Sequence, residues 1–233
     1  MCGRYGLKLG IDEIVAAALE IGELDAEALA VGTAVRAWLP STDIAPTDQA
    51  PVVLARRQKR PRQLALASWG IGRPAAGKRP TLVINARAET VTARPLFRDG
   101  TPALVPASGW YEWPADQPLP GRPRPTWLSQ DTSASNTPTW LAGLSFDDGD
   151  FTRFVILTRP PMPDIEAVHD RMPAIVPRAL IEGWLAGRVA ATQLMNAPLN
   201  GLHYVSVDPR PTGRRSAPSP PAQLDLFGDP KRG

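Results

Sequence analysis

Cysteine and histidine are scarce in this chain of 233 residues, which has one cysteine and two histidines. A single thiol excludes an internal disulfide framework and a zinc site built from cysteines, because both need several thiols at one point. No stretch approaches the roughly 18 consecutive apolar residues that span a bilayer, and no apolar signal segment follows the first residues. These absences predict a soluble protein of the reducing cytoplasm, with no metal, cofactor or membrane partner.

Long helical patterns are few. The segment 12–24 has apolar residues spaced for one helix face, and we expect Asp12 to be its N-cap. Two shorter helices are predicted at 178–185, closed by Gly187, and at 191–195. We expect a single globular domain, because the chain is long enough for one sizeable core.

Short apolar runs bounded by Pro, Gly, Asn or Asp make up most of the remaining pattern and predict strands. These runs are 52–55, 63–69, 82–85, 103–105, 126–129, 139–144, 154–158, 174–176 and 204–207. Their spacing favours a largely antiparallel sheet over a βαβ alternation. The sequence therefore predicts an α+β fold with a β-rich core.

The 27 prolines are unevenly placed. The segment 114–125 is typical of an extended connection, and 211–222 is typical of a disordered tail, since neither holds enough apolar residues to offset the entropy of an ordered chain. We expect a domain over 1–209 and a disordered tail over 210–233.

Basic residues gather in pairs, although the net charge is only +3. Arginine matches phosphate with a planar fork of donors, so the pairs are compatible with a polyanionic partner. Solvated surface charge is the alternative interpretation. The pairs lie at 56–57, 59–60, 78–79 and 214–215.

The single cysteine stands second, in M-C-G-R-Y. Removal of the initiator methionine before a small residue would expose an α-amine beside the thiol of Cys2, and this amine is partly unprotonated at neutral pH. With an aldehyde, the amine forms an imine and the sulfur closes a five-membered thiazolidine ring. Gly3 would allow close approach of a ligand, and Arg4 would hold an anion. The alternative is a small buried residue with no chemical role.

Four stretches occur in a fixed order: M-C-G-R-Y at 1–5, I-N-A-R-A-E-T at 84–90, P-A-S-G-W-Y-E-W at 106–113 and V-H-D-R-M-P at 168–173. With D-I-A-P-T at 43–47 and the Trp69-Gly70 pair, they make the chain resemble the SOS-response-associated peptidase (SRAP) family from residue 1 to about 207. Members of that family shield abasic sites in single-stranded DNA. The chain departs from the family in two places, with Asp43 where asparagine is usual and without further tryptophans after Trp69.

The resemblance implies four catalytic residues. Cys2 would form the covalent link to the open-chain aldehyde of an abasic sugar, and Asn85 would orient the terminal amine. Glu112 lies between Tyr111 and Trp113, so its carboxylate is expected to be desolvated, with a raised pKa suited to proton transfer. His169 would be an acid or base tied to sugar handling and reversal of the link. Taken singly, each of these residue types is also common in structural roles, and such a role is assigned to His203.

The resemblance also implies a DNA groove. Arg4, Arg87 and Arg171 would contact backbone phosphates without reading sequence. Bases beside the lesion would stack on or be wedged apart by Pro46 and Trp113. For Trp113 alone, core packing is the alternative.

The end of the chain carries a second motif, Q-L-D-L-F at 223–227. It resembles the pentapeptide with which bacterial proteins dock on the DNA sliding clamp. Leu224, Leu226 and Phe227 would fill an apolar groove while Gln223 is fixed by hydrogen bonds. The alternative is that this segment folds back on the domain.

Together these features predict an enzyme of the DNA damage response that forms a thiazolidine crosslink to abasic sites in single-stranded DNA, with reversal or a lyase side activity through the imine. One alternative is a cysteine peptidase or amidohydrolase with an N-terminal nucleophile. Another is a clamp-tethered protein that binds single strands without a covalent bond. We expect a monomer associated with the nucleoid.

Overall fold

The computed structural model describes residues 2–21, 29–55, 62–73, 81–114, 124–130, 137–147, 149, 151–199 and 201–206. The expected tail over 210–233 with its clamp motif, the basic pairs and most of the 114–125 segment lie outside these residues. Within the described residues, no helix is long and apolar enough to cross a membrane.

Strands dominate the described chain. They are β1 Arg4–Leu7, β2 Leu29–Val31, β3 Ser41–Ile44, β4 Gln49–Leu54, β5 Arg62–Trp69, β6 Ile71–Arg73, β7 Thr81–Val83, β8 Asn85–Arg87, β9 Thr101–Ala107, β10 Gly109–Glu112, β11 Thr126–Gln130, β12 Thr139–Asp147, β13 Thr152–Arg159, β14 Met172–Pro173 and β15 Leu202–Ser206. The helices are α1 Ile11–Leu19, α2 Pro163–Glu166, α3 Arg178–Leu185 and α4 Ala191–Met195, with 3-10 turns η2 Ala34–Ala37, η3 Val91–Ala93 and η4 Pro95–Phe97. The expected α+β fold with a β-rich core is confirmed.

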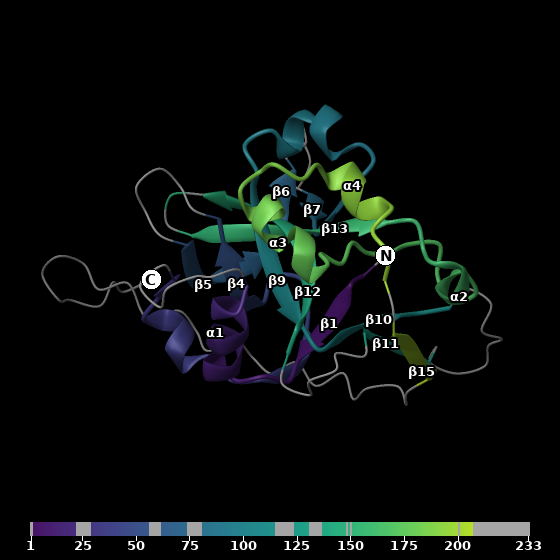
Figure 1. Ribbon diagram of the computed structural model, residues 1–233, viewed down its shortest axis with the longest axis horizontal. Helices are drawn as coiled ribbons and strands as arrows, with labels where there is room; N and C mark the ends of the chain where they lie inside the picture. Colours follow the sequence, from purple (N-terminus) through teal and green to yellow (C-terminus); the bar gives the residue numbers. More distant parts are fainter. Residues whose placement is uncertain are drawn as a thin grey trace, which may run out of the picture.

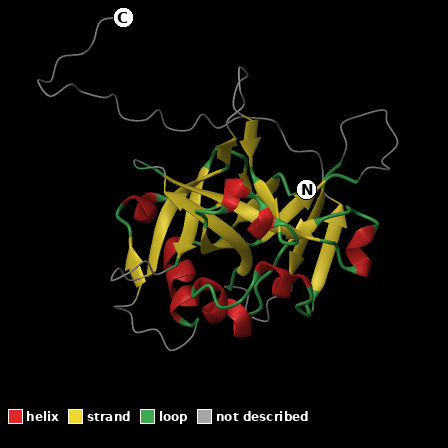
Figure 2. Cartoon of the chain, turned by 90° about the horizontal axis from the view of Figure 1, so that it is seen from above, coloured by secondary structure: helices red, strands yellow, loops and turns green. Residues whose placement is uncertain are grey.

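The larger sheet closes on itself. Its strands follow the order β14-β13-β12-β9-β4-β5-β2, and β13 also pairs with β5 in parallel, where Phe154 is opposite Trp69. This pairing closes the sheet into a barrel, and the rings of the two buried residues stack with their centroids 6.3 Å apart. Because β12 is covered on both faces, its residues from Thr139 to Ser145 are all buried. The helices lie outside the strands (Figures 1 and 2).

A second sheet, in the order β15-β11-β10-β1-β3, carries the N-terminal strand. The chain passes from the barrel into this sheet at Ser108, between β9 and β10, where the Ser108 N–H donates to the Gly6 carbonyl at 2.7 Å. In the register of β1 on β10, Gly6 is opposite Gly109, and a Cβ on Gly109 would lie 2.4 Å from the Trp127 ring. The two glycines therefore let this tryptophan pack closely over the sheet.

The first helix differs from the prediction at its start. Gly10, not Asp12, is the N-cap, and its N–H donates to the Glu13 carboxylate at 2.7 Å. Asp12 lies in the first turn, where its negative charge interacts favourably with the helix dipole. The helix ends at Leu19, earlier than predicted, and 22–28 lies outside the described residues. The helices predicted at 178–185 and 191–195 are confirmed as α3 and α4.

Two strand predictions are wrong in detail. The predicted strand 174–176 does not form a ladder, because the Ala174 N–H bonds to β13 and the Val176 N–H bonds to β12. The predicted strand 82–85 is two strands, since the chain changes partner at Ile84: β7 pairs with β6, and β8 pairs with β13. The Ile84 carbonyl accepts hydrogen bonds from the Trp69 indole and from the Ile156 N–H. This change of partner places Asn85 at the start of β8.

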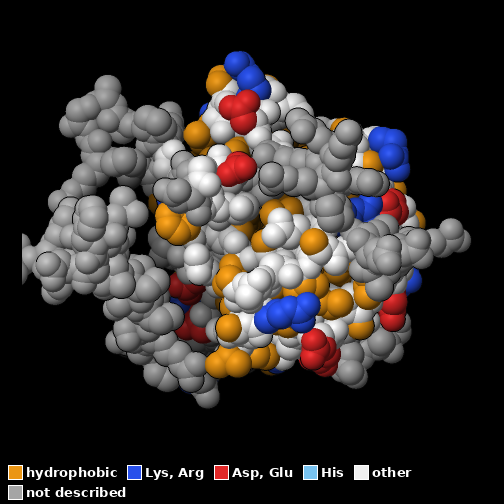
Figure 3. Space-filling view, turned by 90° about the vertical axis from the view of Figure 1, so that its left-hand side faces the viewer, with side chains coloured by type: hydrophobic (Ala, Val, Ile, Leu, Met, Phe, Trp, Pro, Cys, Tyr) orange, Lys and Arg blue, Asp and Glu red, His pale blue; other side chains and the backbone are white. Residues whose placement is uncertain are grey.

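Charge is mixed over the face shown in Figure 3. Described Lys and Arg side chains lie singly there, among acidic and hydrophobic side chains. The described residues therefore form no continuous basic track on this face.

Candidate functional site

Four elements deliver the predicted catalytic residues. Cys2 lies two residues before the start of β1, Asn85 begins β8, Glu112 ends β10, and His169 lies in the turn between α2 and β14. Because β1 pairs with β10 with Arg4 opposite Tyr111, the end of β10 lies beside the start of the chain. The structure brings the four residues together through a set of contacts.

Cys2 is fully buried, and its backbone is held by Asn85. The Asn85 Nδ2 donates to the Cys2 carbonyl at 2.8 Å, and Cys2 Sγ lies 3.7 Å from the Arg4 carbonyl oxygen. Burial, and next the charge of Glu112, raise the pKa of the Cys2 thiol well above its usual value. The sulfur is therefore a protonated thiol at neutral pH, and it needs a base to become a nucleophile.

The other amide atom of Asn85 is available to a ligand or to the chain's own amine. Its Oδ1 is buried and has no hydrogen-bond partner among the described residues. Buried amide oxygens are rarely left without a partner. An unfilled acceptor next to the Cys2 backbone is therefore a position where an N–H donor fits.

Glu112 is a carboxylate placed in the interior, with 1% of its surface exposed. Strand alternation puts it on the same face of β10 as the buried Trp110. Burial raises the pKa of Glu112 to about 7, and the positive charge of the chain's amino terminus opposes this shift. A carboxyl group with this pKa can both give and take a proton near neutral pH.

His169 lies between Glu112 and a turn of its own chain. Its Nε2 is 3.7 Å from the Glu112 Oε2, and its Nδ1 accepts the Arg171 main-chain N–H at 3.0 Å. Acceptance of this N–H by Nδ1 favours the tautomer of the neutral ring that has its proton on Nε2, on the Glu112 side. Burial lowers the pKa of His169, while Asp170, with Oδ1 2.8 Å from Nδ1, opposes that change.

The arginines predicted to contact DNA differ in exposure. Arg87 is exposed at the end of β8, whereas the Arg4 side chain is 40% exposed and donates to Asp43 at 2.7 Å. Arg171 is buried. Phosphate contacts by all three stay a prediction, and the guanidinium of Arg171 already has protein partners.

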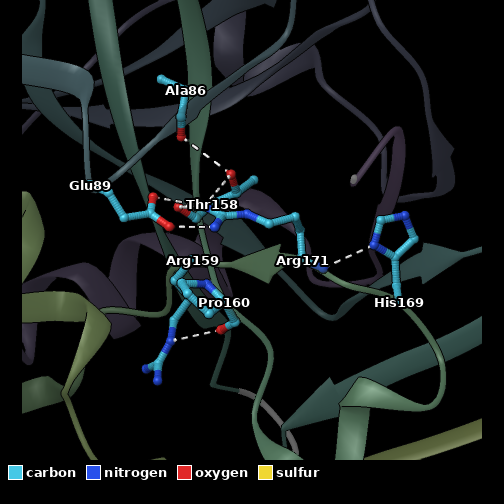
Figure 4. Close-up of polar contacts among 7 residues, drawn as sticks. All are labelled: Ala86, Glu89, Thr158, Arg159, Pro160, His169 and Arg171. Atoms are coloured by element: carbon cyan, nitrogen blue, oxygen red, sulfur yellow. Dashed lines mark hydrogen bonds and ion pairs between the residues drawn. The ribbon is translucent and has the colours of Figure 1, made fainter.

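Those partners are Glu89 and Thr158 (Figure 4). Both terminal nitrogens of Arg171 bind the Glu89 carboxylate, with Nη2 at 2.9 Å from Oε2, and Nη2 also donates to the Thr158 carbonyl at 2.7 Å. The Arg171 Nε is buried without a partner among the described residues. It is the one guanidinium nitrogen left for a further acceptor.

The two predicted stacking residues lie at the surface to different degrees. Trp113 follows β10 and is 40% exposed. Pro46 is half-buried in the turn between β3 and β4, and the next residue, Thr47, has a φ of 78°, which a β-branched residue rarely adopts. Strain of this kind is often retained next to functional sites. Base stacking by Pro46 and Trp113 stays a prediction.

The sequence profile of the family described as SOS response associated peptidase (SRAP) matches residues 1–210. This chain belongs to that family. Two abasic site processing proteins of Bacillus subtilis are relatives of this SRAP protein. YoqW is 27% identical over 190 residues, covering 79% of this chain and 80% of its own, and YobE is 26% identical, covering 79% and 82%.

Solved structures resemble the SRAP fold described above. A phage-related protein of Bordetella bronchiseptica is 25% identical with a TM-score of 0.62, covering 88% of this chain and 94% of its own. A protein of Bacteroides thetaiotaomicron is 15% identical with a TM-score of 0.63, covering 89% and 92%, and it supports the fold alone.

Sequence reasoning missed Glu89 and Thr158 in this SRAP protein. Glu89 lies within the I-N-A-R-A-E-T stretch that carried the resemblance, where an acidic residue two places after Arg87 could have suggested an ion pair. Its partner is 82 residues away in the sequence, so spacing alone gave no way to choose it.

Proposed function

We propose that this SRAP protein handles abasic sites in single-stranded DNA and joins them covalently through a mature N-terminal Cys2. The observation that carries the proposal is a buried Cys2, held at its carbonyl by Asn85, beside a Glu112 whose pKa is about 7. Family membership and the names of the relatives support the abasic-site part of the proposal.

The reaction begins with the α-amine of Cys2. Its nitrogen attacks the aldehyde carbon of the open-chain sugar, a proton passes to the carbonyl oxygen, and water leaves as the imine forms. The thiol then adds across the imine: sulfur binds carbon, and the thiol proton goes to nitrogen. One water is released, and one C–N and one C–S bond form in a thiazolidine ring.

Glu112 fits both proton transfers. In its carboxyl form it donates a proton to the leaving oxygen, and as a carboxylate it takes the proton from the Cys2 thiol. The charge of Glu112 raises the pKa of the Cys2 thiol, so the carboxylate lies within electrostatic range of the sulfur. The unfilled Oδ1 of Asn85 accepts an N–H from the amine and turns the nitrogen lone pair toward the aldehyde.

His169 serves the sugar and the reverse reaction. Its Nε2–H, 3.7 Å from Glu112, reprotonates that carboxylate or a sugar oxygen. When sulfur does not close the ring, the imine acidifies the neighbouring carbon. The Glu112 carboxylate takes a proton from that carbon, a C=C bond forms, and the C–O bond to the 3′ phosphate breaks, which gives a lyase side activity. Arg4 and Arg87 supply positive charge for the backbone on either side, and Trp113 offers an exposed ring for stacking.

Delivery to DNA is a separate part of the proposal. We propose that residues 223–227 dock on the bacterial sliding clamp, which would raise the local concentration of the domain at exposed single strands. Leu226→Ala with Phe227→Ala should abolish clamp capture in a pull-down and leave crosslinking in solution unchanged. Retained capture would remove the clamp from the proposal.

The deciding experiment is a denaturing gel of protein incubated with an abasic single-stranded oligonucleotide. Wild type should give a heat-stable shifted band without reductant. Cys2→Ser, which keeps the amine but lacks the thiol, should give a comparable band only after borohydride reduction of the imine. An undamaged oligonucleotide is the control.

The alternatives predict other outcomes on the same gel. A peptidase that uses the Cys2 thiol for acyl transfer gives no band with either DNA. A non-covalent binder gives a shift in native gels alone. A heat-stable band from protein that mass analysis shows to retain Met1 would refute the aminothiol mechanism.

A further inference from the structure

Arg171 is more buried, and has more contacts with the protein, than a residue that only binds phosphate requires. Its side chain is 10% exposed, and both terminal nitrogens are occupied by Glu89 and Thr158. The Thr158 hydroxyl in turn donates to the Ala86 carbonyl at 3.4 Å. The contacts tie the residue to β8 and β13 together (Figure 4).

The same residue meets His169 through its main chain. The Arg171 N–H donates to His169 Nδ1 at 3.0 Å, and the next residue, Met172, pairs with Arg159 of β13. The side chain of Arg171 therefore anchors the strand side of the turn, and its backbone fixes the ring on the other side. Figure 4 shows the guanidinium and the imidazole on opposite ends of this one residue.

Two groups compete for Nδ1. The Arg171 N–H requires an unprotonated Nδ1, whereas the Asp170 carboxylate at 2.8 Å favours a proton there. The other charged groups that act on the ring are Glu112 on the Nε2 side and the chain's amino terminus. A small displacement of the Arg171 backbone would let Asp170 take over and move the proton away from the Glu112 side.

We propose that Glu89 is a positioning residue for His169: by fixing the Arg171 guanidinium, it holds the Arg171 N–H on Nδ1 and so keeps the imidazole proton on Nε2, facing Glu112. The inference concerns the protein before DNA binds. Its catalytic consequence rests on the proposed function, but the tautomer itself does not. Glu89 remains ionised in this role, because the hydrogen bonds from Arg171 lower its pKa.

The test is the ¹⁵N spectrum of histidine-labelled protein without DNA. The chain has two histidines, so His203 is an internal control in the same spectrum. Wild-type His169 should be in the Nε2–H tautomer. Glu89→Gln, which keeps the shape but removes the charge, should shift His169 toward the Nδ1–H tautomer and change its pKa, while Glu89→Asp should restore most of the wild-type signal.

A second measurement separates positioning from DNA binding. Glu89→Gln should lower the crosslinking rate at saturating abasic DNA about tenfold and shift its pH profile, with non-covalent affinity within about twofold of wild type. If Glu89 instead only competes with DNA phosphate for Arg171, Glu89→Gln will bind DNA more tightly. The salt dependence of binding will then be steeper by about one phosphate contact, and the His169 spectrum will be unchanged. That outcome overturns the proposal.

Two further results bear on it. A wild-type His169 in the Nδ1–H tautomer overturns the proposal even if every Glu89 variant fails to fold. If wild type forms no crosslink but the Glu89→Gln spectrum changes as expected, the positioning role stands and the proposed function fails.

Discussion

Glu112 lies 3.7 Å from the Nε2 of His169, whereas Glu89 binds the side chain of Arg171, whose N–H donates to Nδ1, and the two carboxylates have different surroundings. Glu89, on the β8 side, is 27% exposed and bound by both terminal nitrogens of Arg171, which lowers its pKa. Glu112, at the end of β10, is 1% exposed, and burial raises its pKa to about 7. An arginine fork makes the first carboxylate a fixed anion, whereas desolvation makes the second a group that exchanges protons.

The contrast separates support from chemistry. A permanently ionised carboxylate can hold a cation in place, but it is a poor proton donor at neutral pH. A carboxyl group that titrates near pH 7 serves proton transfer and destabilises the fold when it ionises. The region of β8 and β13 therefore holds a fixed ion pair, and the end of β10 holds a carboxyl group that titrates near neutral pH.

Replacing Arg171 should remove the cation that holds Glu89 ionised, and we expect it to have the largest effect on stability. Arg171→Met leaves Glu89 without its cation, and we expect a loss of about 3 kcal/mol in the free energy of unfolding at pH 7. The pKa of Glu89 is depressed in the folded protein, so this stabilisation is present above its unfolded pKa and is lost as pH falls through the folded pKa. Urea unfolding at pH 7 and pH 3.5 should show the difference shrinking at the lower pH.

Arg178→Met is the matched control. Arg178 also contacts a glutamate, Glu20, but its side chain is 70% exposed. Its loss should change stability by less than about 0.5 kcal/mol. Equal losses from the two variants would show that burial of the Arg171 pair adds nothing.

Replacing Glu112 by a neutral residue should raise stability at high pH, whereas replacing Arg171 should lower it. The folded pKa of Glu112 lies above its unfolded value, so its contribution to stability is complete below the unfolded pKa and is lost as pH rises through about 7. Glu112→Gln should therefore be more stable than wild type by about 3 kcal/mol at pH 8, with little difference at pH 4. Melting temperatures across this range measure the effect, and crosslinking should be lost.

If Glu112→Gln is no more stable than wild type at pH 8, burial does not raise the pKa of Glu112 as described. Glu20→Gln, which changes a carboxylate that is 62% exposed, is the control for the substitution itself. Its stability should follow that of wild type at each pH.

Arg159 tests whether any buried arginine is equivalent to Arg171. It is 9% exposed and donates through Nη1 to the carbonyls of Leu194 and Ala197, both at 3.2 Å, near the end of α4. Arg159→Met should cost about 2 kcal/mol through these carbonyls. It should leave the His169 ¹⁵N spectrum unchanged, because its contacts lead away from the ring. A changed His169 tautomer in this variant would show that the two arginines act on the site alike.

The sequence predicted best what depends on neighbours along the chain. Helices α3 and α4 follow from local apolar spacing. Burial of Glu112 was expected from Tyr111 and Trp113, but strand alternation turns these two rings to the other face of β10, and Glu112 shares its face with the buried Trp110. Asn85 was predicted by resemblance, but its place at a strand start depends on the change of partner at Ile84. That change needs β6 and β13, which lie far apart in the sequence.

Burial of charge was the part that local pattern did not reveal. Arg171 was predicted as an open phosphate ligand, because an arginine in H-D-R-M-P carries no sign of a distant partner. Glu89 and Thr158 reach it only after β8 pairs with β13. Contacts between segments so far apart are set by the closed sheet, and no spacing rule predicts them.

The smallest expected effect is at the surface, where Arg4 and Asp43 form the exposed counterpart of the Arg171 and Glu89 pair. Their side chains are 40% and 32% exposed, so Asp43→Asn should change stability by less than about 0.5 kcal/mol. It should nevertheless strengthen non-covalent binding of single-stranded DNA about threefold at low salt, because Arg4 loses a competing anion. Fluorescence anisotropy over a salt series measures this, with Asp164→Asn, an exposed aspartate on α2, as the control for net charge. The comparison requires the gain to be specific to Asp43: an equal gain from both variants would mean that overall charge, and not release of Arg4, controls the affinity.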